Sequence, residues 1–139
     1  MDEVLSQEVF ARIVTAVSEH AHSLGVGGFL IVGDLETGQA RFAVINKDRP
    51  LRIGVPGKRD VNYAAIAGSK FGFVVAHRRD TGTLSESDLL LGEFGWQGGR
   101  LGSLPRTRDR FVFSFSGATQ EIDLELAGVA ETCLHEELA

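Results

Sequence analysis

Two patterns of apolar residues, one typical of a strand and one of a helix, follow each other near the end of the chain. Residues 111–116 read FVFSFS, so phenylalanines alternate with smaller side chains. This period of two predicts a strand, and its apolar character on nearly both faces predicts that the strand is buried. Thr119 then stands at the N-cap position of a helix that we expect to pack back on the sheet. The apolar stripe of that helix consists of Ile122, Leu126, Val129, Cys133 and Leu138.

The first part of the chain shows the same helical spacing. Ser6 is a suitable N-cap for this helix, and Gly25 is a suitable residue to end it. The two histidines near its end, His20 and His22, would point about 200° apart on a regular helix. They cannot hold one metal ion together, and we interpret them as surface residues. The inward stripe is formed by Val9, Phe10, Ile13, Val14, Val17, Ala21 and Leu24.

A hairpin and a second long helix come next. Residues 28–33 predict a buried strand, 35–38 a turn and 41–45 the returning strand. Asp60 is expected to cap a helix over residues 61–79. Small side chains on one side of this helix would let it lie very close to a sheet or to another helix. These residues are Ala64, Ala65, Ala67, Gly68, Ser69 and Gly72.

The stretch before the last strand is rich in turn-forming residues. Ser85 is a plausible cap for a short helix that runs through Leu91. Residues 92–102 read GEFGWQGGRLG, which predicts a loop. Residues 103–109 contain Pro105 and favour an edge strand or a hairpin turn.

Composition narrows the class of protein. At 139 residues the chain is expected to be a single domain, 1–139, and its net charge of −5 argues against nucleic-acid binding. No apolar run approaches the ~18 residues of a membrane span, and the acidic start MDEVLSQE does not resemble a signal peptide. The single Cys133 is expected to be buried packing rather than a nucleophile, which fits a reducing cytoplasm.

Polar candidates for a site cluster on the middle helix. Tyr63, Lys70 and His77 are spaced by seven residues, so they share one stripe of the helix. This stripe either lines a polar pocket or faces solvent. Arg78 and Arg79 follow at the helix end, where their charge complements the helix dipole.

Two loops add further candidates. Residues 47–59, KDRPLRIGVPGKR, include Arg52 and form either a positive clamp for an anionic ligand or a solvated loop. Trp96 lies among glycines, where an aromatic residue lines a ligand site, joins an oligomer contact or simply packs. Arg100 belongs to the same glycine-rich segment.

Taken together, four stretches resemble the GlcG/HbpS-like family, the heme-binding-protein-like domains that also occur at the C-terminus of PduO-type proteins. They read VLSQEVFARIVTAV, NYAAIAGSKFGFVVAHRRDTG, WQGGRLG and FVFSFSGATQEIDLELAGVA, and they span nearly the whole chain. The last stretch looks like the family's strand–SG–helix signature, here with Ser116, Gly117 and Asp123. The second matches a family helix in which a lysine, here Lys70, precedes small residues.

The resemblance implies a profilin-like α+β fold. Its mainly antiparallel, five-stranded sheet would carry the first and last helices on one face and the middle helix on the other. The resemblance also implies a homo-oligomer with a ligand pocket near the middle helix and the glycine-rich segment. Some members bind heme, and many sit beside catabolic enzymes in gene clusters. Phe71 and Phe73 depart from the family's small residues and would narrow a heme-sized pocket.

Two classes of function remain open, and a purely structural oligomeric scaffold is a third, because the small-residue face of the middle helix would suit subunit packing. A binding module would hold heme or another flat anionic molecule, with His77 as ligand and Lys70, Arg78, Arg52, Trp96 or Arg100 around it. A small catabolic enzyme would instead use Lys70, His77 and Tyr63 as acid–base groups on a carboxylated or ring-derived metabolite.

No catalytic or metal motif stands out in the sequence, and no metal site is expected. Asp123 is a candidate base. A carboxylate at a helix start normally has a lowered pKa, which favours a structural capping role instead.

Overall fold

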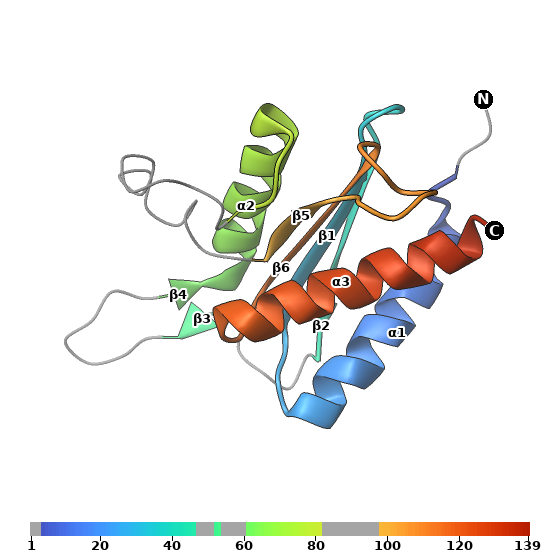
Figure 1. The fold of residues 1–139 in the computed structure, drawn as a ribbon. Helices are drawn as coiled ribbons and strands as arrows, with labels where there is room; N and C mark the ends of the chain where they lie inside the picture. Colours follow the sequence, from blue (N-terminus) through green and yellow to red (C-terminus); the bar gives the residue numbers. More distant parts are fainter. Residues whose placement is uncertain (1–3, 47–51, 54–60, 82–97) are drawn as a thin grey trace.

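The computed structural model describes residues 4–46, 52–53, 61–81 and 98–139 (Figure 1). Three helices and six strands lie in these ranges. The helices are α1 (Gln7–Leu24), α2 (Tyr63–His77) and α3 (Gln120–Glu137). The strands are β1 (Gly28–Asp34), β2 (Ala40–Ile45), β3 (Arg52–Ile53), β4 (Val61–Asn62), β5 (Gly99–Leu101) and β6 (Phe111–Ser116).

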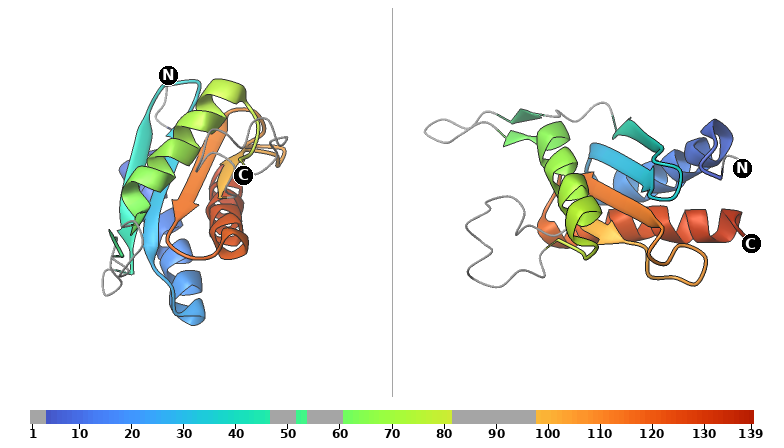
Figure 2. Two further views of the ribbon diagram at one scale, coloured as in Figure 1. Left: turned by 90° about the vertical axis from the view of Figure 1, so that its left-hand side faces the viewer. Right: turned by 90° about the horizontal axis from the view of Figure 1, so that it is seen from above.

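The described strands form a four-stranded antiparallel sheet in the order β2-β1-β6-β5 and a separate two-stranded pair, β3-β4. Helices α1 and α3 cover one face of the larger sheet, and α2 crosses the other (Figures 1 and 2). The α+β class and this placement of the helices agree with the prediction. The larger sheet has four described strands rather than the five expected.

Strand β6 lies at the centre of the molecule because it is apolar on both faces, as its sequence predicts. Phe111, Phe113 and Phe115 belong to the core under α1 and α3, and all three are fully buried. Val112 packs against α2 on the other face, where the hydroxyl of Ser114 donates a 2.7 Å hydrogen bond to the Ala67 carbonyl. The strand therefore joins the two helical layers.

The capping residues of the first and last helices were predicted correctly. The Ser6 hydroxyl accepts a hydrogen bond from the Val9 amide, and Thr119 does the same for the Ile122 amide. Gly25 ends α1 with a left-handed φ of 68°, which glycine adopts without strain. Leu24 was expected in the inward stripe but is 41% exposed, because it lies in the last turn of α1, where the chain leaves the core.

Other expectations were wrong. Asn62, not Asp60, caps α2: its side chain accepts a hydrogen bond from the Ala65 amide, and the helix begins at Tyr63. Residues 99–101 form edge strand β5 within the segment expected to be a loop, because their backbone pairs with β6. Residues 103–109 form the turn, which was one of two alternatives. In the described residues, no helix is long and apolar enough to cross a membrane.

Candidate functional site

Lys70 is the most unusual polar residue in the described structure. Its side chain is 1% exposed, although it carries an ammonium group. The Nζ atom donates to the Phe115 carbonyl at 3.1 Å and to Asp123 Oδ2 at 3.1 Å. This one side chain therefore joins α2 to the end of β6 and to the first turn of α3.

Asp123 completes this connection from the other side. Its Oδ1 atom accepts a 2.9 Å hydrogen bond from the Ala118 amide, so the carboxylate also holds the turn between β6 and α3. Gly117 in this turn leaves no room for a side chain, because a Cβ atom would overlap the Gly27 carbonyl. Gly117 and Asp123 thus hold the turn that lies beside the Lys70 ammonium.

Burial shifts the pKa of both partners toward their neutral forms. Loss of solvent lowers the pKa of Lys70, although Asp123 opposes the change. Loss of solvent likewise raises the pKa of Asp123, against the effect of Lys70 and of the turn amides. The sequence predicted a lowered pKa for this carboxyl, and that was wrong because desolvation outweighs the helix start and the nearby cation.

Tyr63 and His77, which share one stripe of α2 with Lys70, have different surroundings. Tyr63 is half-buried, and its pKa is raised by burial and by the charge of Asp123. His77 is exposed at the opposite end of α2 and stacks on Phe73, with ring centroids 4.4 Å apart. The structure thus associates Tyr63 with the Lys70–Asp123 pair and places His77 about two helical turns away.

Basic residues gather beside His77. Arg78 follows it with a left-handed φ of 56°, and its amide donates to the Val74 carbonyl. The Arg79 guanidinium lies 5.8 Å from the centroid of the Phe73 ring. Arg78 also lines a small cavity of about 230 Å³ beside Phe71 and Leu35.

Phe71 and Phe73 themselves belong to the packing of α2 on the sheet. Phe73 is buried among Val74 and Val112, and a Cβ atom on Gly33 would overlap the Phe71 ring.

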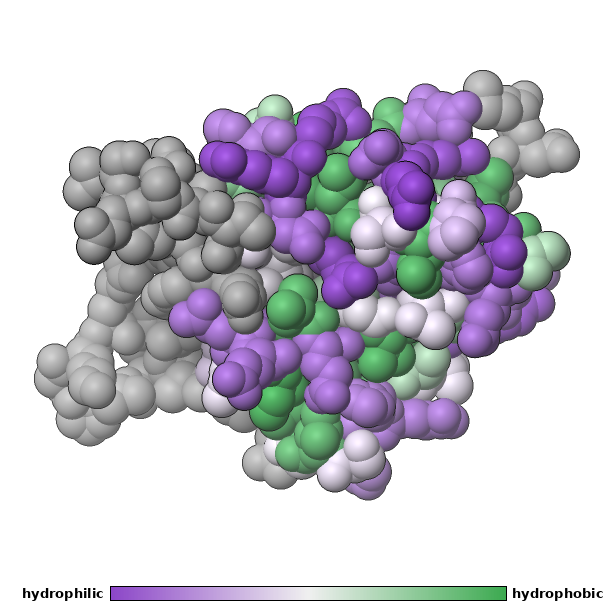
Figure 3. Space-filling view, viewed as in Figure 1, coloured by the Kyte–Doolittle hydropathy of each residue, from purple (hydrophilic) through white to green (hydrophobic). Residues whose placement is uncertain are grey.

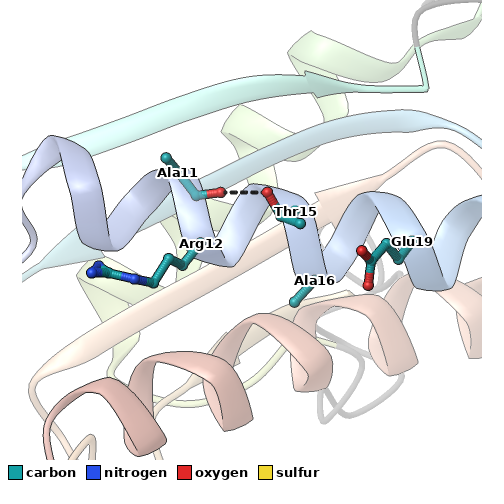
Figure 4. Close-up of a pocket in the computed structure, with 5 residues that line it drawn as sticks. All are labelled: Ala11, Arg12, Thr15, Ala16 and Glu19. Carbon is teal, nitrogen blue, oxygen red and sulfur yellow. Dashed lines mark hydrogen bonds between the residues drawn. The ribbon is translucent and has the colours of Figure 1, made fainter.

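A larger hollow lies on the opposite side of the molecule, between α1 and α3. It has a volume of about 530 Å³, and it adjoins a smaller hollow of about 320 Å³ along α1 (Figure 4). Apolar patches interrupt the charged surface over these two helices (Figure 3). We call the larger hollow the α1–α3 groove. It is lined by Ala16, His20, Arg100, Leu104, Glu125, Gly128, Val129, Thr132, Cys133 and Glu136.

The polar groups of the α1–α3 groove are only partly engaged with one another. His20 Nε2 lies 3.4 Å from Glu125 Oε2 but makes no hydrogen bond among the described residues. Cys133 is half-buried, and burial together with Glu137 and Glu136 raises the pKa of its thiol. The thiol therefore stays protonated, as expected for a packing role.

Arg100 connects this groove to a buried carboxylate. Its Nε atom donates to Glu131 Oε1 at 2.8 Å, and Glu131 also accepts from the Thr107 hydroxyl and the Ser103 amide. Burial opposes ionisation of Glu131, but these hydrogen bonds together outweigh it and lower the pKa. Glu131 thus orients Arg100 at the rim of the groove.

Sequence reasoning placed the site on α2 and missed the groove. His20 was interpreted as a surface residue because only its own helix was considered, and the groove depends on α3 lying beside α1. Trp96 and most of the 47–59 loop lie outside the described residues. Arg52 stands in β3, and the surroundings of its side chain are not described. Among the described residues, no three histidine, cysteine or carboxylate side chains could hold a metal ion together.

Among the solved structures that match this chain, two share its fold over nearly its whole length. The crystal structure of the Klebsiella pneumoniae protein ORFY, of family DUF336, matches with a TM-score of 0.67 and 17% identity, covering 94% of this chain and 90% of that one. The PduOC–heme complex matches with a TM-score of 0.64 and 18% identity, covering 93% and 94%. Neither a family model nor a curated protein matches the sequence. The GlcG/HbpS-like resemblance is thus confirmed at the level of an α+β fold, whereas a five-stranded, profilin-like sheet stays a prediction.

Proposed function

We propose that the chain is a homo-oligomeric protein that binds a flat, anionic small molecule, with heme as the first ligand to test. The α1–α3 groove carries this proposal. Its volume of about 530 Å³ lies in the range of small-molecule sites, and it combines apolar side chains with a few polar groups. The shared fold with a protein whose structure contains heme supports the choice of probe.

His20 is the side chain in the groove best suited to bind iron. A neutral imidazole is a common axial ligand of heme, and His20 Nε2, which is buried beside Glu125, makes no hydrogen bond to a described residue. Cys133 is less suitable because its raised pKa disfavours the thiolate. The Glu125 side chain, which is 53% exposed, would have to rotate away from His20. Arg100 at the rim is the basic side chain nearest to hand for a propionate, which would share it with Glu131.

His77, at the C-terminal end of α2, is the alternative iron ligand to His20. His77, the ligand predicted from sequence, is exposed and stacks on Phe73. That role stays an untested prediction, and the geometry favours His20.

A hemin titration followed by the Soret band tests the two histidines against each other. We expect the wild type to saturate at one heme per subunit. His20→Ala should bind at least about tenfold more weakly, or ~1.4 kcal/mol, with a changed Soret maximum. Glu125→Ala should bind more tightly, because it exposes Nε2 and removes a negative charge, whereas His77→Ala should match the wild type. Loss of binding in His77→Ala alone would move the site to α2, and no Soret shift in the wild type would refute heme binding.

A catabolic enzyme is the second candidate, and the Lys70–Asp123 pair favours it. Its two pKa values are shifted toward the neutral forms, a pattern frequent in acid–base sites, and Tyr63 lies within its electrostatic influence. Tyr63→Phe removes the hydroxyl and leaves the buried pair in place. Turnover of a small carboxylate by the wild type that is lost in Tyr63→Phe would support this function. An absence of turnover across a carboxylate panel would reject it.

A further inference from the structure

The two edges of the four-stranded sheet differ in how their backbone groups are satisfied. At the β5 edge, the Gly99 amide donates to the Thr81 hydroxyl, and the Thr81 amide donates to the Gly99 carbonyl, each at 2.9 Å. The Leu101 amide donates to Asp80 Oδ1 at 2.7 Å. Two residues that follow α2 therefore close this edge.

The β2 edge is open among the described residues. The Asp34 amide donates to the Gln39 carbonyl at 2.7 Å. Because hydrogen-bonded and non-hydrogen-bonded pairs alternate along an antiparallel ladder, this bond determines which residues of β2 direct their backbone groups toward β1. Residues 41, 43 and 45 then direct their amides and carbonyls toward β1. Ala40, Phe42 and Val44 direct theirs outward, and no described residue bonds to these groups.

Strand β2 also lacks the features that normally protect an edge. It contains no proline, and its register with β1 runs without a bulge. Its only charged side chain, Arg41, turns inward and donates to the Leu5 carbonyl at 2.8 Å. Phe42 is 70% exposed and stacks on Phe29 at 5.5 Å. An apolar strand with free backbone groups is suited to pair with another strand.

We propose that β2 pairs antiparallel with β2 of a second copy of this chain, across a two-fold axis at Phe42. In this register Phe42 lies opposite Phe42 of the partner subunit, and Ala40 lies opposite the partner's Val44. All three positions have outward backbone groups, so each outward amide and carbonyl of Ala40, Phe42 and Val44 would bond to the partner subunit. Two four-stranded sheets then become one continuous sheet of eight strands.

The strand's own pattern favours a second copy over an unrelated peptide. The symmetric register places outward-directed residues opposite one another, as a two-fold interface requires. It also places each Arg41 opposite the partner's Ala43, so like charges do not face each other. Phe42 is exposed, so the two aromatic rings would meet at the axis and lose contact with solvent. This inference rests on the homo-oligomeric part of the proposed function and is independent of the ligand.

Sedimentation equilibrium of three variants tests the interface. Phe42→Lys puts two charges at the axis, and Val44→Pro removes an outward amide without breaking the ladder to β1. Both should raise the dissociation constant by about 30-fold or more. Leu24→Lys, an equally apolar-to-charged change at an exposed position, should match the wild type. A monomeric wild type, or an assembly unaffected by Phe42→Lys, would overturn the proposal.

Amide hydrogen exchange separates strand pairing from any other interface. In the assembled wild type, amides 40, 42 and 44 should be protected as well as 41, 43 and 45. In Phe42→Lys, protection should be lost only at 40, 42 and 44, because the inner set still bonds to β1. Rapid exchange of amides 40, 42 and 44 in an assembled wild type would show that the copies meet elsewhere. This conclusion does not depend on the outcome of the hemin titration.

Discussion

The Lys70 side chain connects two helices to the central strand, and burying its charge is costly. A buried ion pair gains stability only where both partners are present and hydrogen-bonded, and removal of one leaves an unpaired buried charge. Lys70 and Asp123 satisfy each other, and the Phe115 carbonyl and the Ala118 amide complete the set. The pair therefore specifies how α2 and α3 meet the end of β6.

Replacing Lys70 should reveal this role. Lys70→Met leaves the Asp123 carboxylate buried without a cation, and we expect a loss of about 3–5 kcal/mol in the free energy of unfolding at pH 7. The loss should shrink as the pH falls through the raised pKa of Asp123, since the protonated carboxyl needs no counter-charge. Urea unfolding at several pH values measures both effects.

The double variant Lys70→Met with Asp123→Leu is the control. It removes both charges, so it should recover part of the lost stability. A double variant less stable than Lys70→Met would contradict the ion-pair explanation.

The sequence predicted the positions of these residues on their helix but not the groups that they contact. A spacing of seven correctly places Tyr63, Lys70 and His77 along one helix, but it does not tell what lies across from each. Lys70 meets the start of α3, whereas His77 is exposed and stacks on Phe73. The raised pKa of Asp123 depends on the same contact between distant segments.

At the scale of elements, local sequence signals predicted the helix ends and the central strand well. The pairing of strands that are distant in sequence could not be predicted. Ser6, Gly25 and Thr119 act within a few residues, and the alternation in 111–116 is visible directly. Strand β5 has only three residues and is recognisable only through its pairing with β6.

Replacing Gly72 tests whether α2 needs a glycine at that position for close packing. Gly72 lies in the helix interior, and a Cβ atom added there would meet no other atom within 4 Å, so close packing does not require glycine. Gly72→Ala should therefore stabilise the protein by about 0.5–1 kcal/mol, seen as a higher Tm. Gly117→Ala is the contrasting variant and should destabilise, because its Cβ atom would overlap the Gly27 carbonyl. A lower Tm for Gly72→Ala would indicate a contact at this position in the assembly.

Glu131 ties α3 to the turn before β6 and predicts a response to acid. Its pKa is lowered from the ordinary 4.5, so its contribution is fully present above pH 4.5 and is lost as the pH falls through the folded-state pKa. Glu131→Gln should cost about 1–3 kcal/mol at pH 7 and flatten the decline of stability in acid. Thermal unfolding between pH 3 and 7 measures this difference, and parallel curves for the two proteins would refute it.

At the scale of the whole molecule, the two helical layers carry different features. Helix α2 supplies Lys70 to the buried pair with Asp123, and the layer on the opposite face of the sheet holds the α1–α3 groove. The sequence predicted this layering through the family resemblance. It could not predict the groove, since that surface forms only where residues from α1, α3, β5 and the turn after β5 come together.

Native mass spectrometry of the protein before and after incubation with hemin tests the proposed function most directly. We expect an assembly with an even number of subunits that gains one heme mass per subunit, and a His20→Ala variant that keeps the assembly but loses the added mass. A wild-type assembly that takes up no heme, or one whose uptake is unchanged in His20→Ala, would contradict a heme site in the α1–α3 groove.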